Sequence, residues 1–272
     1  MIKNCLEEYI MIKLFACDLD GTLLTEHNQI STADIEALHH LLEKGVEVII
    51  ASGRKDYDIK KVINMIGSSC HRVSQNGAFA YLKNDTHLHA TTFPKEASIE
   101  IFNFIKSFPV VPIVSTEDEE FIEQDDPHLK QIEHKLFSPV KIDKQLPLKV
   151  GQTIVPSKFI VNGSFDVLSS LRTDLLSTFP NTVDAFISGE HVLDVAPKYT
   201  NKGNAIASIM SDMNIERSEL ACIGDAFNDI SMFELTPHSF AMTNAHPDVK
   251  QKATYVVDSV SEAIEILKKE ID

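Results

Sequence analysis

Two aspartates stand one residue apart, directly after a short apolar run, in the segment KLFACDLDGTLL. The carboxylates of Asp18 and Asp20 would repel each other at this spacing unless a cation, a shifted proton or a covalent role stabilises them. Gly21 and Thr22 follow at once, so the pair lies where a buried strand gives way to a turn. A carboxylate in that position can be a nucleophile, a metal ligand or a helix cap.

Polar groups also follow apolar runs elsewhere in the chain. The segments concerned are ASGR at 51–54, SQNG at 74–77 and IGDAFND at 223–229. In an open parallel sheet, ligands bind beyond the carboxyl ends of the strands. Lys202 opens a predicted helix and can point to the same edge. Each signal is weak by itself, and together they predict one site.

Calcium binding and structural capping are the alternatives for the aspartate pair. An EF-hand loop also begins D-x-D, but it needs an acid at its twelfth position, where this chain has Gln29. A role as helix caps would explain Asp18 and Asp20 if they were considered without the other acids. The segment IGDAFND weakens that alternative, because Asp225 and Asp229 would join Asp18 at the sheet edge. Three converging carboxylates are costly without a divalent cation, and oxygen-only ligands suit Mg²⁺.

The segment ASGR offers groups that could bind an anion. Ser52 supplies a hydroxyl, Gly53 allows close backbone approach, and the following helix presents free N–H groups. Roles without a catalytic or binding function also stay open for these residues. Ser52 and Gly53 could form a plain strand-to-helix turn, Lys202 could be a solvated lysine, and Arg54 could pair with a nearby acid such as Asp56.

The elements that would position these residues follow an alternating strand–helix pattern. Such alternation predicts parallel strands with right-handed crossovers, an α/β sheet. The expected strands lie at 12–17, 46–52, 71–77, 220–224, 239–242 and 254–257, and the expected helices at 31–45, 55–67, 202–213 and 229–235 with a last one after 257.

The middle of the chain has a different pattern. Paired strands within 78–93 and 182–196, helices at 98–108 and 165–179, and several prolines indicate an antiparallel sheet with helices on one side. We therefore expect a Rossmann-like α/β core at 11–80 and 196–272, interrupted by an inserted α+β cap domain at 81–195. Residues 1–10 are expected to be an N-terminal extension.

Composition bounds the function. The 272 residues are 43% hydrophobic and 24% charged, as in an ordinary soluble protein, and carry a formal net charge of −15. Such a chain repels nucleic acid and anionic lipid. Its first residues include acids where a signal peptide would be apolar, so no signal peptide is expected. Since no apolar run reaches about 18 residues, no membrane span is expected either. Its four scattered cysteines form no CxxC pair, which favours buried free thiols in a reducing cytoplasm.

The motifs, taken in order, resemble those of the haloacid dehalogenase superfamily, and in particular its Cof-like phosphatases. The segment from Asp18 to Thr22 matches the first motif, and Ser52-Gly53-Arg54 the second. Lys202 in YTNKGNA matches the third, and GDAFND at 224–229 the fourth. The resemblance implies a Rossmann-like core with an α/β cap of type IIB inserted between the second and third motifs.

The resemblance also implies roles for the matching residues. Asp18 would be the nucleophile that forms an aspartyl-phosphate, and Asp20 the general acid and then the base. Mg²⁺ would be held by the Asp18 carboxylate, the Asp20 backbone carbonyl and Asp225, with Asp229 in support. The residues expected to bind the phosphoryl oxygens are Ser52, Gly53, Lys202 and Asn228. Arg54 and Asn76 are expected to contact the substrate.

The function that follows is a Mg²⁺-dependent phosphatase that acts on small phosphorylated metabolites such as sugar phosphates or phosphorylated cofactors. A phosphotransferase or phosphomutase on the same scaffold is the first alternative, since it would use the same two aspartates. A non-catalytic binding protein is the second, although it predicts a damaged motif and none is found. We expect a cytoplasmic monomer or homodimer that binds neither nucleic acid nor membranes.

Overall fold

The computed structural model describes residues 11–25, 27–125, 139–189 and 191–268. The expected N-terminal extension and Cys5 therefore lie outside the described residues. Contacts between residues divide the chain into two compact units. The first comprises the described residues within 1–54, 59–89 and 201–272, and the second those within 55–58 and 90–200.

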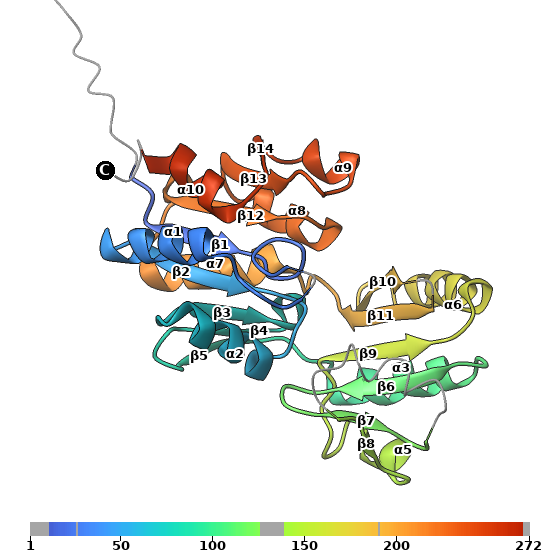
Figure 1. Ribbon diagram of the computed structural model, residues 1–272. Coiled ribbons are helices and arrows are strands. Elements are labelled where there is room, and N and C mark those ends of the chain that lie inside the picture. Colours follow the sequence, from blue (N-terminus) through green and yellow to red (C-terminus); the bar gives the residue numbers. More distant parts are fainter. Residues whose placement is uncertain (1–10, 26, 126–138, 190, 269–272) are drawn as a thin grey trace, which may run out of the picture. The chain divides into compact units, whose positions relative to one another are not determined.

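The first unit is built on an eight-stranded sheet with the order β14-β13-β12-β1-β2-β3-β4-β5 (Figure 1). Strands β14 to β3 in this order are parallel, and β4 pairs antiparallel with β3. Central strands such as β1 and β12 are buried along their whole length, as expected for strands covered on both faces. The strands are β1 (Leu14–Cys17), β2 (Glu47–Ala51), β3 (His71–Ser74), β4 (Phe79–Tyr81), β5 (His87–Ala90), β12 (Leu220–Gly224), β13 (His238–Met242) and β14 (Tyr255–Val257).

Helices cover both faces of this sheet. On one face, Leu38, Ile59 and Ile264 bring α1, α2 and α10 into one hydrophobic cluster. On the other face, α7, α8 and α9 contribute residues such as Ile206 and Met232 to a second cluster. The helices are α1 (Thr32–Glu43), α2 (Asp56–Ile66), α7 (Lys202–Met213), α8 (Ile230–Phe233), α9 (Pro247–Lys250) and α10 (Val260–Leu267), with 3₁₀ turns at Gln75–Gly77, Arg217–Glu219 and Phe227–Asp229.

The second unit has a six-stranded sheet with the order β10-β11-β9-β6-β7-β8. Its pairs are antiparallel except for β7 with β8, which is parallel, so the sheet is mixed where a purely antiparallel one was expected. Leu171 of α6 and Ile101 of α3 pack with Val161 of β9 in one apolar cluster. The elements are α3 (Lys95–Lys106), β6 (Val111–Ser115), β7 (Glu120–Ile122), β8 (Lys141–Ile142), α5 (Leu146–Lys149), β9 (Lys158–Asn162), α6 (Phe165–Thr178), β10 (Val183–Gly189) and β11 (Val192–Pro197).

The division between the units differs from the boundaries read from the sequence. Residues 81–89 were assigned to the insertion, yet β4 and β5 extend the first sheet, with Ala80 opposite Val73. At the other end, residues 196–200 stay with the second unit. The Lys198 Nζ atom and the Tyr199 backbone N–H both donate to Asp184 of β10, at 2.7 and 2.9 Å, which ties this segment to that sheet.

Candidate active site

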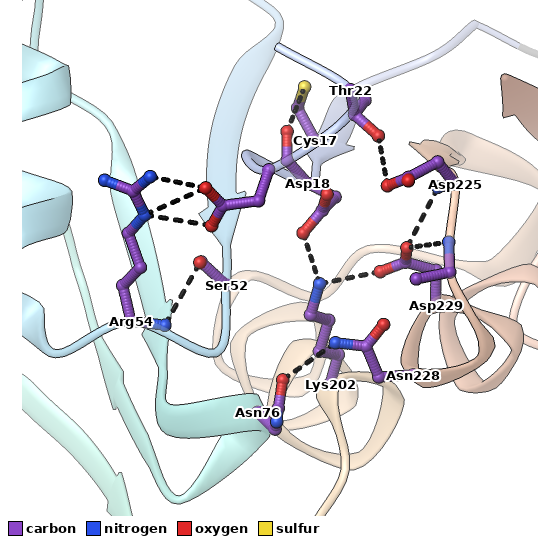
Figure 2. A network of polar contacts seen from close by, with 12 residues as sticks. Cys17, Asp18, Thr22, Ser52, Arg54, Asn76, Lys202, Asp225, Asn228 and Asp229 are labelled. Atoms are coloured by element: carbon purple, nitrogen blue, oxygen red, sulfur yellow. Dashed lines mark hydrogen bonds and ion pairs between the residues drawn. The ribbon is translucent and has the colours of Figure 1, made fainter. Parts of the chain in front are cut away.

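The candidate site lies wholly within the first unit, at the carboxyl ends of three neighbouring parallel strands. Asp18 follows β1, Ser52 follows β2, and Asp225 follows β12. Strand β1 pairs with β2 on one side and with β12 on the other, so the loops that leave these strands emerge side by side. Lys202 is the first residue of α7. Figure 2 shows these side chains converging from the separate loops.

The buried Lys202 ammonium group joins two carboxylates. Its Nζ atom lies 2.5 Å from Asp18 Oδ1 and 2.6 Å from Asp229 Oδ1 (Figure 2). The side chains of Lys202 and Asp229 are both 0% exposed, and that of Asp18 is 7% exposed. A buried ammonium requires such partners, because its transfer out of water is otherwise very costly. The alternative that Lys202 is a solvent-exposed surface lysine is therefore wrong.

The Asp229 carboxylate also organises the loop that follows β12. Its Oδ2 atom accepts hydrogen bonds from the backbone N–H groups of Asp225 and Ala226, at 3.0 and 2.9 Å. Gly224 makes room for this arrangement, since a Cβ atom there would lie 2.4 Å from the Asp229 carboxyl carbon. Both oxygens of Asp229 thus bind protein groups, which suits a supporting residue better than a principal metal ligand.

Asp18, Asp225 and Asp229 form an acidic cluster in which one oxygen from each residue lies within 4.8 Å of the others. Burial, followed by the nearby Asp229 carboxylate, raises the pKa of Asp18 well above its usual value, against the opposing effect of Lys202. The same two causes raise the pKa of Asp225. Burial lowers the pKa of Lys202, but Asp18 and Asp229 outweigh it and the net direction is upward.

This cluster fits a divalent cation. Three carboxylates face one ammonium group, so when all are ionised two negative charges remain uncompensated. Burial first, and then the neighbouring Asp229 carboxylate, raise the pKa values of Asp18 and Asp225, so the ionised cluster is costly without a compensating cation. A cation with two charges would remove that cost, and the donor atoms are all oxygens, which hard cations such as Mg²⁺ prefer.

Asp20 lies apart from this cluster and is engaged by Arg54. Its side chain is 56% exposed, whereas that of Arg54 is only 11% exposed. The Arg54 Nε atom donates to Asp20 Oδ2 at 2.9 Å and to Oδ1 at 3.2 Å, and Nη2 also bonds Oδ1. The arginine that the sequence assigned to substrate contact thus forms a two-pronged ion pair with the expected acid and base.

Ser52, Gly53, Asn76 and Asn228 line a neighbouring part of the site. Ser52 is fully buried, and its Oγ atom accepts the Arg54 backbone N–H at 3.1 Å. Asn228 Nδ2 donates to Asn76 Oδ1 at 2.9 Å, which joins the loop after β12 to the turn after β3. A Cβ atom at position 53 would lie 3.2 Å from Asn76 Oδ1, so the glycine permits this close approach.

Three polar residues that the sequence reasoning left without a role complete the network. Thr22 Oγ1 donates to Asp225 Oδ1 at 3.1 Å, and Asn244 Nδ2 donates to the Gly21 carbonyl at 3.0 Å. Asn28 accepts from Arg54 Nη2 at 2.8 Å. Thr22 lies inside the first of the motifs that carry the family resemblance, so a signal existed for it. The surroundings of Asn28 in the sequence give none.

An α/β core that gathers Asp18, the buried Lys202 and the further carboxylates of Asp225 and Asp229 at one sheet edge is typical of a haloacid dehalogenase-type hydrolase. Comparison with known families agrees, because the model of the haloacid dehalogenase-like hydrolases matches residues 15–264. The chain belongs to this family.

Several similar proteins are named as phosphatases. The chain is 27% identical over 268 residues to phosphatase YwpJ of Bacillus subtilis, a match that covers 90% of this chain and 94% of the relative. It is 28% identical over 250 residues to the HMP-PP phosphatase of Yersinia pseudotuberculosis, a match that covers 89% of this chain and 88% of the relative. The crystal structure of TM0651 from Thermotoga maritima superposes with a TM-score of 0.85 at 28% identity, covering 94% of this chain and 97% of that one.

These comparisons confirm the resemblance to Cof-like phosphatases, the α/β fold class and the assignment as a phosphatase of this family. Among the described residues, none of the helices is long and apolar enough to cross a membrane. The roles given to individual residues stay predictions, and they are taken up next.

Proposed function

We propose that the chain is a Mg²⁺-dependent phosphatase that hydrolyses small phosphorylated metabolites through a phosphorylated Asp18. The observation that carries the proposal is the contact of Lys202 with both Asp18 and Asp229 inside a cluster that includes Asp225. This contact orients Asp18 beside a cation-binding set of oxygens. Relatives named as phosphatases for HMP-PP and for 5-amino-6-(5-phospho-D-ribitylamino)uracil support small phosphorylated metabolites as the substrate class.

In the first step, an oxygen of the Asp18 carboxylate forms a bond to phosphorus while the bond from phosphorus to the ester oxygen breaks. Asp20, as the acid, gives its proton to the departing oxygen, which leaves as an alcohol. Lys202 neutralises part of the charge around Asp18 throughout. Ser52, the Gly53 backbone N–H and Asn228 bind the phosphoryl oxygens that do not react.

In the second step, Asp20 acts as the base. It takes a proton from water as the water oxygen bonds to phosphorus, and the bond from phosphorus to Asp18 breaks. Inorganic phosphate is released and the Asp18 carboxylate is restored. Because Asp20 is largely exposed and lies outside the buried cluster, it is able to meet both the departing alcohol and the incoming water.

Residues that would hold Mg²⁺ are Asp18 and Asp225, with the Asp20 backbone carbonyl, while Asp229 supports them. Asp229 receives this lesser role because its two oxygens already bind Lys202 and two backbone N–H groups. A carboxylate and one phosphate charge about 4 Å apart repel by about 4 kcal/mol at an effective dielectric of about 20. A bound cation offsets this repulsion and polarises the phosphoryl group.

The buried free thiols of Cys17, Cys70 and Cys222 fit a reducing, cytoplasmic setting for this activity. Burial raises the pKa of Cys70 to about 12 and those of the other two thiols well above their usual value. These thiols therefore stay protonated at neutral pH and take no part in the proposed reaction.

The test is phosphate release from a panel of sugar phosphates, phosphorylated cofactors and ribityl phosphates. Wild type is expected to release phosphate with Mg²⁺ and to lose that activity with a chelator. Asp18→Asn should lose at least about 10³-fold in kcat, because the nucleophile is gone. Asp212→Asn is the matched control, since Asp212 is an exposed aspartate of α7 outside the site, and it should keep wild-type activity.

The intermediate has its own measurement. Borohydride reduces an acyl phosphate, so treatment during turnover should convert Asp18 to homoserine in a peptide found by mass spectrometry. If folded wild type releases no phosphate from any ester while transferring it to an added sugar, the phosphotransferase alternative replaces this proposal. Turnover that persists in Asp18→Asn would remove the assigned nucleophile.

A further inference from the structure

The ion pair between Arg54 and Asp20 has an unusual distribution of exposure. The arginine is the more buried partner, with 11% of its side chain exposed, and the carboxylate is the exposed one, at 56%. An exposed carboxylate gains little stability from a surface ion pair, typically less than about 1 kcal/mol. Placing an arginine mainly inside the protein in order to hold such a carboxylate therefore calls for a reason other than stability.

Several bonds fix the arginine in place. Its backbone N–H donates to Ser52 Oγ at 3.1 Å, and its carbonyl accepts from the Gln75 N–H at 2.8 Å. Its Nη2 atom also donates to Asn28 Oδ1 at 2.8 Å. Asn28 adopts a left-handed backbone with φ of 54° and closes a turn onto the Thr25 carbonyl at 2.9 Å. Arg54 thus joins the end of β2, the turn after β3 and the segment that follows Asp20.

The guanidinium group fixes the plane of the Asp20 carboxylate. Its Nε and Nη2 atoms contact both carboxylate oxygens, and a planar fork of this kind restricts rotation far more than a single bond does. A residue that passes a proton to a leaving group must stay within hydrogen-bond reach of it. A small displacement of the acid from that position lowers the reaction rate strongly.

We propose that Arg54 is a positioning residue for Asp20, which it holds in the orientation that delivers a proton to the departing alcohol oxygen. This inference rests on the proposed function, because it takes Asp20 as the acid. It replaces the expectation that Arg54 contacts the substrate. A contact with the phosphoryl group would affect every ester alike, whereas a positioning residue matters only where Asp20 must supply a proton; the double-mutant cycle below separates positioning from a contact with the leaving group.

Two classes of ester separate these roles. An alkyl phosphate, such as a sugar phosphate, needs a proton on its departing oxygen, whereas p-nitrophenyl phosphate releases an anion that is stable near neutral pH. The quantity to compare is kcat/KM, which covers binding and transfer to Asp18 but not the later hydrolysis. For Arg54→Met we expect kcat/KM to fall about 10- to 100-fold on the alkyl ester. The loss is smaller than that expected on removing the acid itself, because a misplaced Asp20 still supplies part of the acid catalysis. On the aryl ester the loss should stay below about 3-fold.

Arg54→Lys keeps the positive charge but not the fork, so its loss on the alkyl ester should lie between those of wild type and Arg54→Met. Arg217→Lys is the matched control. Arg217 donates to main-chain carbonyls of Leu235 and Glu234 outside the site, and its variant should keep the wild-type ratio between the two esters. Thermal unfolding of each variant establishes that it is folded.

A double-mutant cycle with Asp20→Asn completes the test. In the Asp20→Asn background, Arg54→Met should change kcat/KM on the alkyl ester by less than about 2-fold, because the group it positions is already gone. Equal losses on both esters, or independent losses in the cycle, would overturn the inference while leaving Asp20 as the acid. If Asp20→Asn itself spares the alkyl ester, the acid assignment in the proposed function fails, and this inference fails with it.

Discussion

Asp225 and Asp229 are both acidic residues of one loop, yet their surroundings give them opposite effects on stability. Asp229 is fully buried and accepts from Lys202 and from two backbone N–H groups. Asp225 is only partly buried, accepts from Thr22 and has a pKa raised by burial and by Asp229. An acid whose pKa is raised by folding disfavours the folded state above that pKa, whereas an acid that partners a buried lysine supports it.

The contrast predicts different outcomes for two equivalent substitutions. In metal-free buffer at neutral pH, Asp225→Asn should be at least as stable as wild type, because it removes a charge that the fold opposes. Asp229→Asn should lose about 1–3 kcal/mol, since the amide NH₂ group must face either Lys202 or the backbone donors. Urea unfolding in the presence of a chelator measures both, and equal free energies of unfolding for the two variants would contradict the contrast. Both are expected to lose phosphatase activity.

At the scale of elements, the helices α1 and α10 show how distant segments are locked together. Asp34 in the first turn of α1 is buried, and its Oδ2 atom accepts the Ser31 hydroxyl at 2.7 Å. Its Oδ1 atom accepts the backbone N–H of Ser261, near the start of α10, at 2.8 Å. The two helices share one apolar cluster. The carboxylate therefore fixes the relation of two helix starts that lie far apart in the sequence.

Replacing Asp34 by Ala should lower the free energy of unfolding by about 1–3 kcal/mol, because the partly buried N–H group of Ser261 loses its acceptor. Activity per folded molecule should stay close to wild type, since Asp34 lies outside the site. Chemical unfolding together with kcat/KM tests both halves of the expectation. Asp212→Ala, an exposed position of α7, serves as the control and should leave stability nearly unchanged. Unchanged stability in Asp34→Ala would mean that apolar packing alone fixes the two helices.

Local pattern predicts the elements well and their long-range pairing less well. The apolar runs at 12–17 and 220–224 identify strands β1 and β12, and capping by Ser31 marks the start of α1. The hairpin of β4 and β5 was recognised, but its membership of the first sheet was not, because pairing with β3 is a tertiary property. The contact of Arg54 with Asp20 is similar, since it joins positions 34 residues apart that only the fold brings together. Motif spacing could identify Asp18, Lys202 and Asp225 because each lies at the end of an element that the pattern already places.

At the scale of the whole molecule, the repulsion between negative charges is what a bound metal ion would relieve. The chain carries a formal net charge of −15, and its acidic cluster concentrates part of this charge in a buried position. A net charge far from zero destabilises a compact state through self-repulsion. Added salt of any kind relieves the general repulsion by screening, but only a cation bound at the cluster relieves the local one.

Mg²⁺ should therefore stabilise the folded protein beyond the effect of NaCl at equal ionic strength. Binding to the folded state alone adds about 1.4 kcal/mol when free Mg²⁺ is ten times its dissociation constant, which corresponds to roughly 3–6 °C in Tm. Asp225→Asn should lose this shift, because it removes a proposed principal ligand, while Asp212→Asn keeps it. Differential scanning calorimetry with matched ionic strength measures the shift without any need for turnover. An equal rise in Tm for wild type and Asp225→Asn would show that Mg²⁺ does not act through Asp225, and the cluster would lose its proposed role as the metal site.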